Sequence, residues 1–130
     1  MFAQVWAKAD AAVAAGRANR SWLWGPQPNY LGYEAYQQGP GERRLVQYYD
    51  KSRMEVNNPG GDRSNPYFVT NGLLAVEMIA GEIQVGDSTF ITASVPATIP
   101  VAGDPRKDNP LTPSYATFAS VSSCANVTSG

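Results

Sequence analysis

The sequence predicts a small α+β fold, in which a twisted antiparallel sheet carries one or two short helices and is rich in turns. One segment at the N-terminus has apolar residues at helical spacing, whereas two later segments alternate in the manner of paired strands. The 12 glycines and 10 prolines among 130 residues also favour a chain with many turns over a helical bundle. Because 43% of the residues are hydrophobic, we expect one compact domain over residues 1–121, with a tail or linker over 122–130.

The first residues predict a helix over about 2–15. Val5 and Trp6 would face the core, and Gly16 is a natural residue to end the helix. An extended N-terminal segment is the competing interpretation.

Two aromatic segments follow. Ser-Trp-Leu-Trp at 21–24 predicts a short strand, and the Gly- and Pro-containing residues 27–41 predict a loop. Within this loop Tyr30, Tyr33 and Tyr36 recur at every third residue, which suits a local 3₁₀ or polyproline-like path.

Residues 44–56 predict a hairpin with its turn at 50–52, followed by a loop over 57–66. We expect one face to carry Val46, Tyr48, Met54 and Val56, and the other Gln47, Tyr49, Arg53 and Glu55.

The apolar residues after this loop predict a short helix over 72–80. Thr70 or Asn71 can cap its start and Gly81 can end it. A strand over the same residues remains open, since Leu74, Val76 and Met78 would then share one face.

Two short apolar runs, 82–85 and 89–93, flank Gly-Asp and predict a second hairpin. Residues 96–113 should be mostly irregular, with Tyr115 and Phe118 anchoring the last ordered segment. The expected core comprises Trp6, Trp22, Val46, Tyr48, Met54, Val56, Phe68, Leu73, Leu74, Met78, Ile83, Val85 and Phe90.

Charge and composition exclude several functional classes. The net charge is −1 and no run of like charge exceeds two residues, so we expect no nucleic-acid partner. No apolar run reaches the roughly 18 to 20 residues that span a bilayer, so we expect no membrane insertion. With no histidine, Ser-His-Asp and Cys-His nucleophiles and most catalytic zinc sites are excluded. The single Cys124 cannot form an intrachain disulfide. The composition, rich in Gly, Pro and small polar residues, favours an exported bacterial protein.

Aromatic residues are the candidate ligand contacts. In a strand, Trp22 and Trp24 would project from one face and form a platform for sugar rings, which Tyr30, Tyr33 and Tyr36 could widen. The alternative is that one or both tryptophans belong to the core.

Carboxylate, lysine or tyrosine chemistry is the remaining route to an enzyme. Asp50 and Glu55 could be imagined as a glycosidase pair, but alternation places them on opposite strand faces, where ion pairing fits better. The acidic loop 104–109 and Asp62 have weak metal-ligand patterns. We therefore expect no catalytic residue, no metal and no cofactor.

The segments Val46-Gln47-Tyr48-Tyr49-Asp50-Lys51-Ser52-Arg53-Met54-Glu55 and Val69-Thr70-Asn71-Gly72-Leu73-Leu74 carry a resemblance. Together they resemble the pattern V-Q-Y-F-E-R-x-R-x-E … G-L-L-G of bacterial cell-surface accessory domains. Leu31-Gly32-Tyr33 is similar to an element of the LGFP-type surface repeats. The resemblance implies an accessory module attached to wall-associated or other extracellular proteins.

These observations lead to one main functional expectation. We expect a non-catalytic extracellular or cell-surface module that binds cell-wall or other polysaccharide, or docks a partner domain. A small carboxylate-based hydrolase and a structural or assembly subunit of a surface protein are the alternatives.

Overall fold

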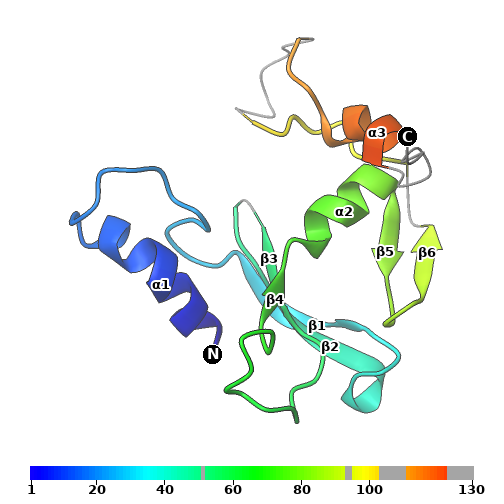
Figure 1. Ribbon diagram of the computed structural model, residues 1–130, viewed down its shortest axis with the longest axis horizontal. Helices are drawn as coiled ribbons and strands as arrows, with labels where there is room; N and C mark the ends of the chain where they lie inside the picture. Colours follow the sequence, from blue (N-terminus) through cyan, green and yellow to red (C-terminus); the bar gives the residue numbers. More distant parts are fainter. Residues whose placement is uncertain (51, 93–94, 103–110, 123–130) are drawn as a thin grey trace, which may run out of the picture. The chain divides into compact units, whose positions relative to one another are not determined.

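The computed structural model describes residues 1–50, 52–92, 95–102 and 111–122 (Figure 1). These contain helices, a four-stranded antiparallel sheet and a two-stranded sheet, which confirms the α+β class. The chain divides into two compact units, residues 1–74 with 85–87 and residues 75–84 with 88–130, and each is described by itself. The expected single domain over 1–121 stays a prediction.

Helix α1 (Phe2–Ala14) confirms the N-terminal helix. Its side chains Val5, Trp6 and Ala9 pack against a cluster of buried apolar residues, as expected of the first two. The cluster comprises Phe2, Trp24, Tyr49, Met54 and Val56.

The four-stranded sheet has the order β1-β2-β3-β4. Its strands are β1 (Tyr30–Ala35), β2 (Arg43–Tyr48), β3 (Arg53–Val56) and β4 (Thr70–Asn71), with the short 3₁₀ helix η1 (Pro40–Glu42) between β1 and β2. The hairpin predicted over 44–56 is therefore confirmed. Two other predictions are wrong, because 21–24 forms no strand and much of the expected loop 27–41 is β1. Pairing of β1 along the whole of β2 outweighs the local turn chemistry of that segment.

The register of the β2–β3 hairpin corrects the predicted faces. Val46 pairs with Glu55 and Tyr48 with Arg53, so these four side chains share one face. Met54 and Val56 lie on the opposite face, in the core with α1. The reason is the turn: Tyr49 N–H donates to the Ser52 carbonyl at 2.8 Å, so even positions of β2 oppose odd positions of β3.

The second unit holds most of α2 (Leu73–Ala80), which confirms the helix over the strand alternative. Gly81 ends the helix with φ +74°, as expected of a glycine at that position. The buried Glu77 of α2 accepts the backbone N–H of Gln84 at 3.0 Å, which ties the helix to β5.

The predicted second hairpin is confirmed by β5 (Glu82–Gln84) and β6 (Phe90–Thr92), which pair antiparallel. Two of its residues do not join the expected core, since Ile83 and Phe90 are 39% and 47% exposed. A two-stranded ribbon has too little surface to cover its own apolar side chains. The chain continues to η2 (Tyr115–Phe118) and α3 (Ala119–Ser122), with Tyr115 N–H bonded to the Ile99 carbonyl at 3.2 Å.

Candidate binding site

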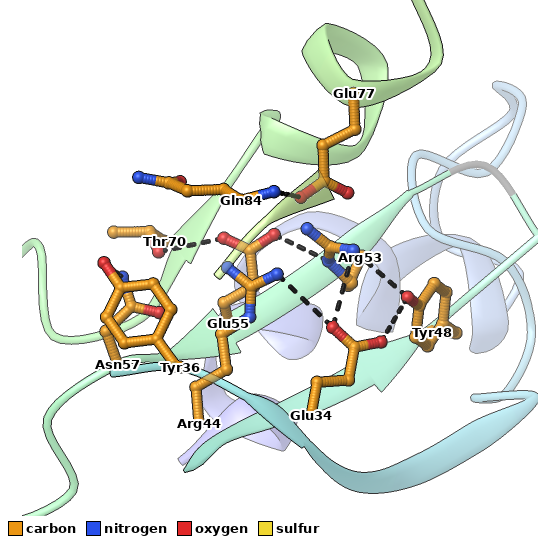
Figure 2. A network of polar contacts seen from close by, with 10 residues as sticks. All are labelled: Glu34, Tyr36, Arg44, Tyr48, Arg53, Glu55, Asn57, Thr70, Glu77 and Gln84. Carbon is orange, nitrogen blue, oxygen red and sulfur yellow. Dashed lines mark hydrogen bonds and ion pairs between the residues drawn. The ribbon is translucent and has the colours of Figure 1, made fainter. Parts of the chain in front are cut away.

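One face of the four-stranded sheet carries a cluster of charged side chains (Figure 2). Glu34 Oε2 lies 3.3 Å from Arg44 Nη2 and 3.6 Å from Arg53 Nη1. Arg53 Nε also donates to Glu55 Oε1 at 2.8 Å. Both arginines and Glu55 are at most 2% exposed. Two guanidinium groups and two carboxylates thus balance each other inside the protein.

Hydroxyl groups complete this cluster. Tyr48 donates to Glu34 Oε1 at 2.5 Å and accepts from Arg53 Nη1 at 3.1 Å, and Thr70 Oγ1 lies 3.2 Å from Glu55 Oε2. Burial, followed by the bond to Glu34, raises the pKa of Tyr48. Each of the four carboxylate oxygens therefore already has a hydrogen-bond or ion-pair partner. We infer that the cluster is structural and fixes the register of the strands.

A different arrangement lies where η1 and the residues after β3 meet. A groove of about 380 Å³ is lined by Tyr33, Pro40, Gly41, Arg43 and Pro59. A pocket of about 340 Å³ is lined by Tyr36, Gln38, Gly39, Pro40, Asn57, Asn58 and Asp87. The two hollows share Pro40, and Asn58 of the pocket precedes Pro59 of the groove in the chain. We refer to the groove and the pocket together as the hairpin-end cleft.

The Gly-Pro-Gly sequence between β1 and β2 builds the shared wall of this cleft. Tyr36 N–H donates to the Glu42 carbonyl and Glu42 N–H to the Gly39 carbonyl, both at 2.9 Å. Pro40 begins η1, where its missing N–H costs nothing. A Cβ on Gly39 would lie 1.9 Å from the Arg43 carbonyl oxygen, so a side chain there would force the backbone apart.

The groove combines flat apolar surface with one positive charge. Tyr33 is 62% exposed and lines the groove together with Pro40 and Pro59. These rings are therefore accessible to a ligand. The Arg43 side chain is exposed and forms no ion pair with any residue that the structure describes. Such a surface suits a ring with apolar C–H faces and polar edges.

The pocket is polar. The hydroxyl of the buried Tyr36 donates to Asp87 Oδ1 at 2.7 Å and faces Asn57 Nδ2 at 3.4 Å. Asp87 N–H in turn donates to Gln38 Oε1 at 2.8 Å. Burial, together with the Asp87 carboxylate, raises the pKa of Tyr36 to about 12, so its hydroxyl remains protonated at ordinary pH. These bonds hold amide and carboxylate groups in place around the hollow.

The five predicted ligand contacts divide between core and surface. Trp24 is 5% exposed, with its ring 5.7 Å from that of Tyr49, and Trp22 stacks on Trp6 at 6.4 Å. The shared tryptophan platform is therefore wrong, and Trp24 is a core residue. Tyr30 is 54% exposed but lies on the face of the charged cluster.

Of the predicted tyrosines, Tyr33 lines the groove and Tyr36 lines the pocket of the hairpin-end cleft. Tyr33 has its ring exposed in the groove, whereas Tyr36 is only 3% exposed and contributes to the pocket wall. The predicted 3₁₀ or polyproline path is wrong for this segment, because Tyr30 and Tyr33 are strand residues on opposite faces.

Asp10 explains why Trp24 is buried. This fully buried carboxylate accepts the backbone N–H groups of Leu23, Trp24 and Gly25 at 3.0, 2.7 and 3.3 Å. Burial alone would raise its pKa, but these donors and Arg20 outweigh burial, and the pKa of Asp10 is lowered. Residues 23–25 are thus fixed to α1 and cannot present a strand face.

Sequence reasoning missed most of the cleft. The groove adds Pro40, Gly41, Arg43 and Pro59, and the pocket adds Gln38, Gly39, Asn57, Asn58 and Asp87. The one available signal was Gly-Pro-Gly beside an aromatic strand, which marks a tight turn near exposed rings. No pattern in the sequence predicts that Asp87 lies next to a turn some fifty residues earlier in the chain.

The remaining carboxylate candidates do not form a shared site. Asp50 is exposed and accepts from Asn29 Nδ2 at 2.8 Å, whereas Glu55 is buried in the charged cluster. Asp62 accepts the N–H and hydroxyl of Ser64 in a local turn. The described residues hold no group of three or more potential metal ligands, and the loop 104–109 lies outside them.

Comparison with protein-family models, curated proteins and solved structures gave no match to this chain. The resemblance to cell-surface accessory domains stays a prediction. Among the described residues, no helix is long and apolar enough to span a bilayer.

Proposed function

We propose that this chain is a non-catalytic extracellular or cell-surface module that binds a polysaccharide at the hairpin-end cleft. The observation that supports it is a pair of hollows that have Pro40 in both linings. One hollow is lined by an exposed tyrosine and two prolines, and the other by amide and carboxylate groups. A sugar ring offers apolar C–H faces and hydroxyl edges, so it can contact either kind of surface.

Rigidity of the cleft favours binding. Tyr33 is on a strand paired along its whole length with β2, and the proline rings have few conformations to lose. The pocket groups Asp87 and Gln38 are already hydrogen-bonded to the protein. Little conformational entropy is therefore lost when a ligand binds.

The lining of the cleft argues against glycoside hydrolysis. Glycosidases use two carboxyl groups roughly 5 to 9.5 Å apart across the substrate. Among the residues that line the two hollows, Asp87 is the one acid, and its carboxylate accepts the Tyr36 hydroxyl. A single acid of this kind can bind a sugar hydroxyl but cannot complete that mechanism.

A second candidate, docking of a partner domain, is favoured by β1. This strand forms one edge of the sheet, and Leu31 and Tyr33 on it are 57% and 62% exposed. An exposed edge with apolar side chains can pair with a strand from another protein. Leu31 lies outside the cleft lining, so Leu31→Lys should weaken docking and leave glycan binding unchanged.

The test compares Tyr33→Ala with Tyr67→Ala, a matched control that is 79% exposed and outside the cleft. Pull-down on insoluble bacterial cell wall, chitin and cellulose would measure bound fraction against protein concentration. An aromatic contact of about 0.5–1.5 kcal/mol predicts a loss of roughly 2- to 12-fold for Tyr33→Ala alone. Equal losses in both variants, or no binding to any of the three materials by the wild type, would refute the proposed function.

A further inference from the structure

A third hollow, which we name the α1 cavity, lies in the first unit and shares no lining residue with the hairpin-end cleft. It measures about 590 Å³, within the range of roughly 300–1,000 Å³ that is usual for ligand pockets. Gln4, Val5 and Lys8 line it from α1, and Arg63, Phe68 and Val69 are among the residues that line it from the opposite segment. Gln4 and Lys8 are one helical turn apart and so lie on the same face of α1.

The apolar wall of the α1 cavity is fixed by the core. Val5, Phe68 and Val69 are partly buried and pack against the buried cluster that includes Phe2 and Met54. Their remaining surface is available to a ligand, and it is held in position by residues that cannot move without loss of core packing. The wall therefore suits a hydrocarbon or aromatic group.

The charge on the lining is of one sign. Lys8 and Arg63 are its only ionisable side chains, and neither forms an ion pair with any residue in the described parts of the chain. The acid nearest to Arg63 in sequence, Asp62, lies outside the lining, where its carboxylate accepts two hydrogen bonds from Ser64. Two cations beside an apolar wall favour an anionic ligand.

We infer that the α1 cavity binds a carboxylate that carries a short hydrocarbon or aromatic tail. Arg63 can donate two parallel hydrogen bonds to the carboxylate, and Lys8 adds a second positive charge from the opposite wall. The tail then packs against Val5, Phe68 and Val69. This site is independent of polysaccharide binding.

Octanoate is the probe, measured against octanol and octylammonium by isothermal titration calorimetry on the full chain. Octanoate should bind at least about tenfold more tightly than either, since a charge-assisted hydrogen bond is worth about 1.5 kcal/mol or more. Lys8→Gln and Arg63→Gln should each weaken octanoate binding by roughly fivefold or more, whereas Arg17→Gln, an exposed control on the same part of the chain, should not.

The variants change exposed side chains, so circular dichroism should show wild-type folding for each. Tyr33→Ala, which alters the cleft, should leave octanoate binding unchanged. Equal or tighter binding of octylammonium, no heat on octanoate titration, or wild-type affinity in the Lys8→Gln/Arg63→Gln double variant would each overturn the inference. Failure of glycan binding would leave it intact.

Discussion

Asp10→Asn is the substitution whose effect can be worked out most fully from the structure. The carboxylate is fully buried and receives three backbone N–H groups from residues 23–25, with Arg20 Nη1 at 3.4 Å. An asparagine of the same shape keeps one acceptor oxygen and turns the other into an NH₂ donor. At least one backbone N–H is then left buried opposite another donor.

The expected loss combines two effects. A hydrogen bond to a charged group contributes about 1.5–3 kcal/mol, and a buried donor without a partner costs about 1–3 kcal/mol. The two overlap, so we expect the free energy of unfolding to fall by about 3 kcal/mol. For a chain of this length that corresponds to roughly 10 °C in melting temperature.

The pH dependence gives the result a second signature. Because the pKa of Asp10 is lowered in the folded state, its carboxylate stabilises the fold above the unfolded pKa of about 3.9. This stabilisation is lost as the pH falls through the lower pKa of the folded protein. Urea unfolding of wild type and Asp10→Asn from pH 7 down to pH 2 should therefore show two curves that converge in acid.

Asp62→Asn is the control, since hydrogen bonds from Ser64 also lower the pKa of Asp62 but its side chain is exposed. Its melting temperature should stay close to that of the wild type. A destabilisation of Asp10→Asn no larger than that of Asp62→Asn, or one independent of pH, would show that Asp10 does not hold residues 23–25 to α1.

Two further predictions concern the sheet. Glu55→Gln removes one charge of a buried pair and leaves the Arg53 guanidinium partly uncompensated. Urea unfolding should therefore show a free energy of unfolding about 3 kcal/mol lower than that of the wild type. Wild-type stability would contradict a structural role for the charged cluster. The raised pKa of Tyr36 contributes stability that is complete below the unfolded pKa of about 10 and is lost as the pH rises to about 12. Tyr36→Phe should reduce the pH dependence of the free energy of unfolding over that interval, and an unchanged dependence would exclude Tyr36 as its source.

Local signals predicted much of the fold. Helix α1, helix α2 and the two hairpins each follow from apolar spacing and a glycine or turn residue at the end. In contrast, β1 depends on pairing with β2, which outweighs a segment rich in turn formers. The register of the first hairpin depends on how many residues its turn contains, and an error of one residue moved Met54 and Val56 to the wrong face.

The candidate site was less predictable because it also depends on contacts between residues that are distant in the sequence. Tyr33 and Tyr36 could be named from the sequence, but their separation into an exposed ring and a buried one follows from strand geometry and tertiary packing. The burial of Trp24 depends on Asp10, fourteen residues earlier, and no pattern in the sequence signals that contact. Long-range hydrogen bonds of this kind decide which aromatic rings can meet a ligand.

The most direct test of glycan recognition is a titration of ¹⁵N-labelled protein with soluble chitotetraose and cellotetraose, followed by NMR. We expect amide shifts to concentrate in the segments 33–43 and 57–59 and at residue 87, which contain the lining of the hairpin-end cleft, and we expect Tyr33→Ala to suppress them. Shifts centred on Trp22 or Tyr30, or saturable binding that Tyr33→Ala leaves unaltered, would contradict it.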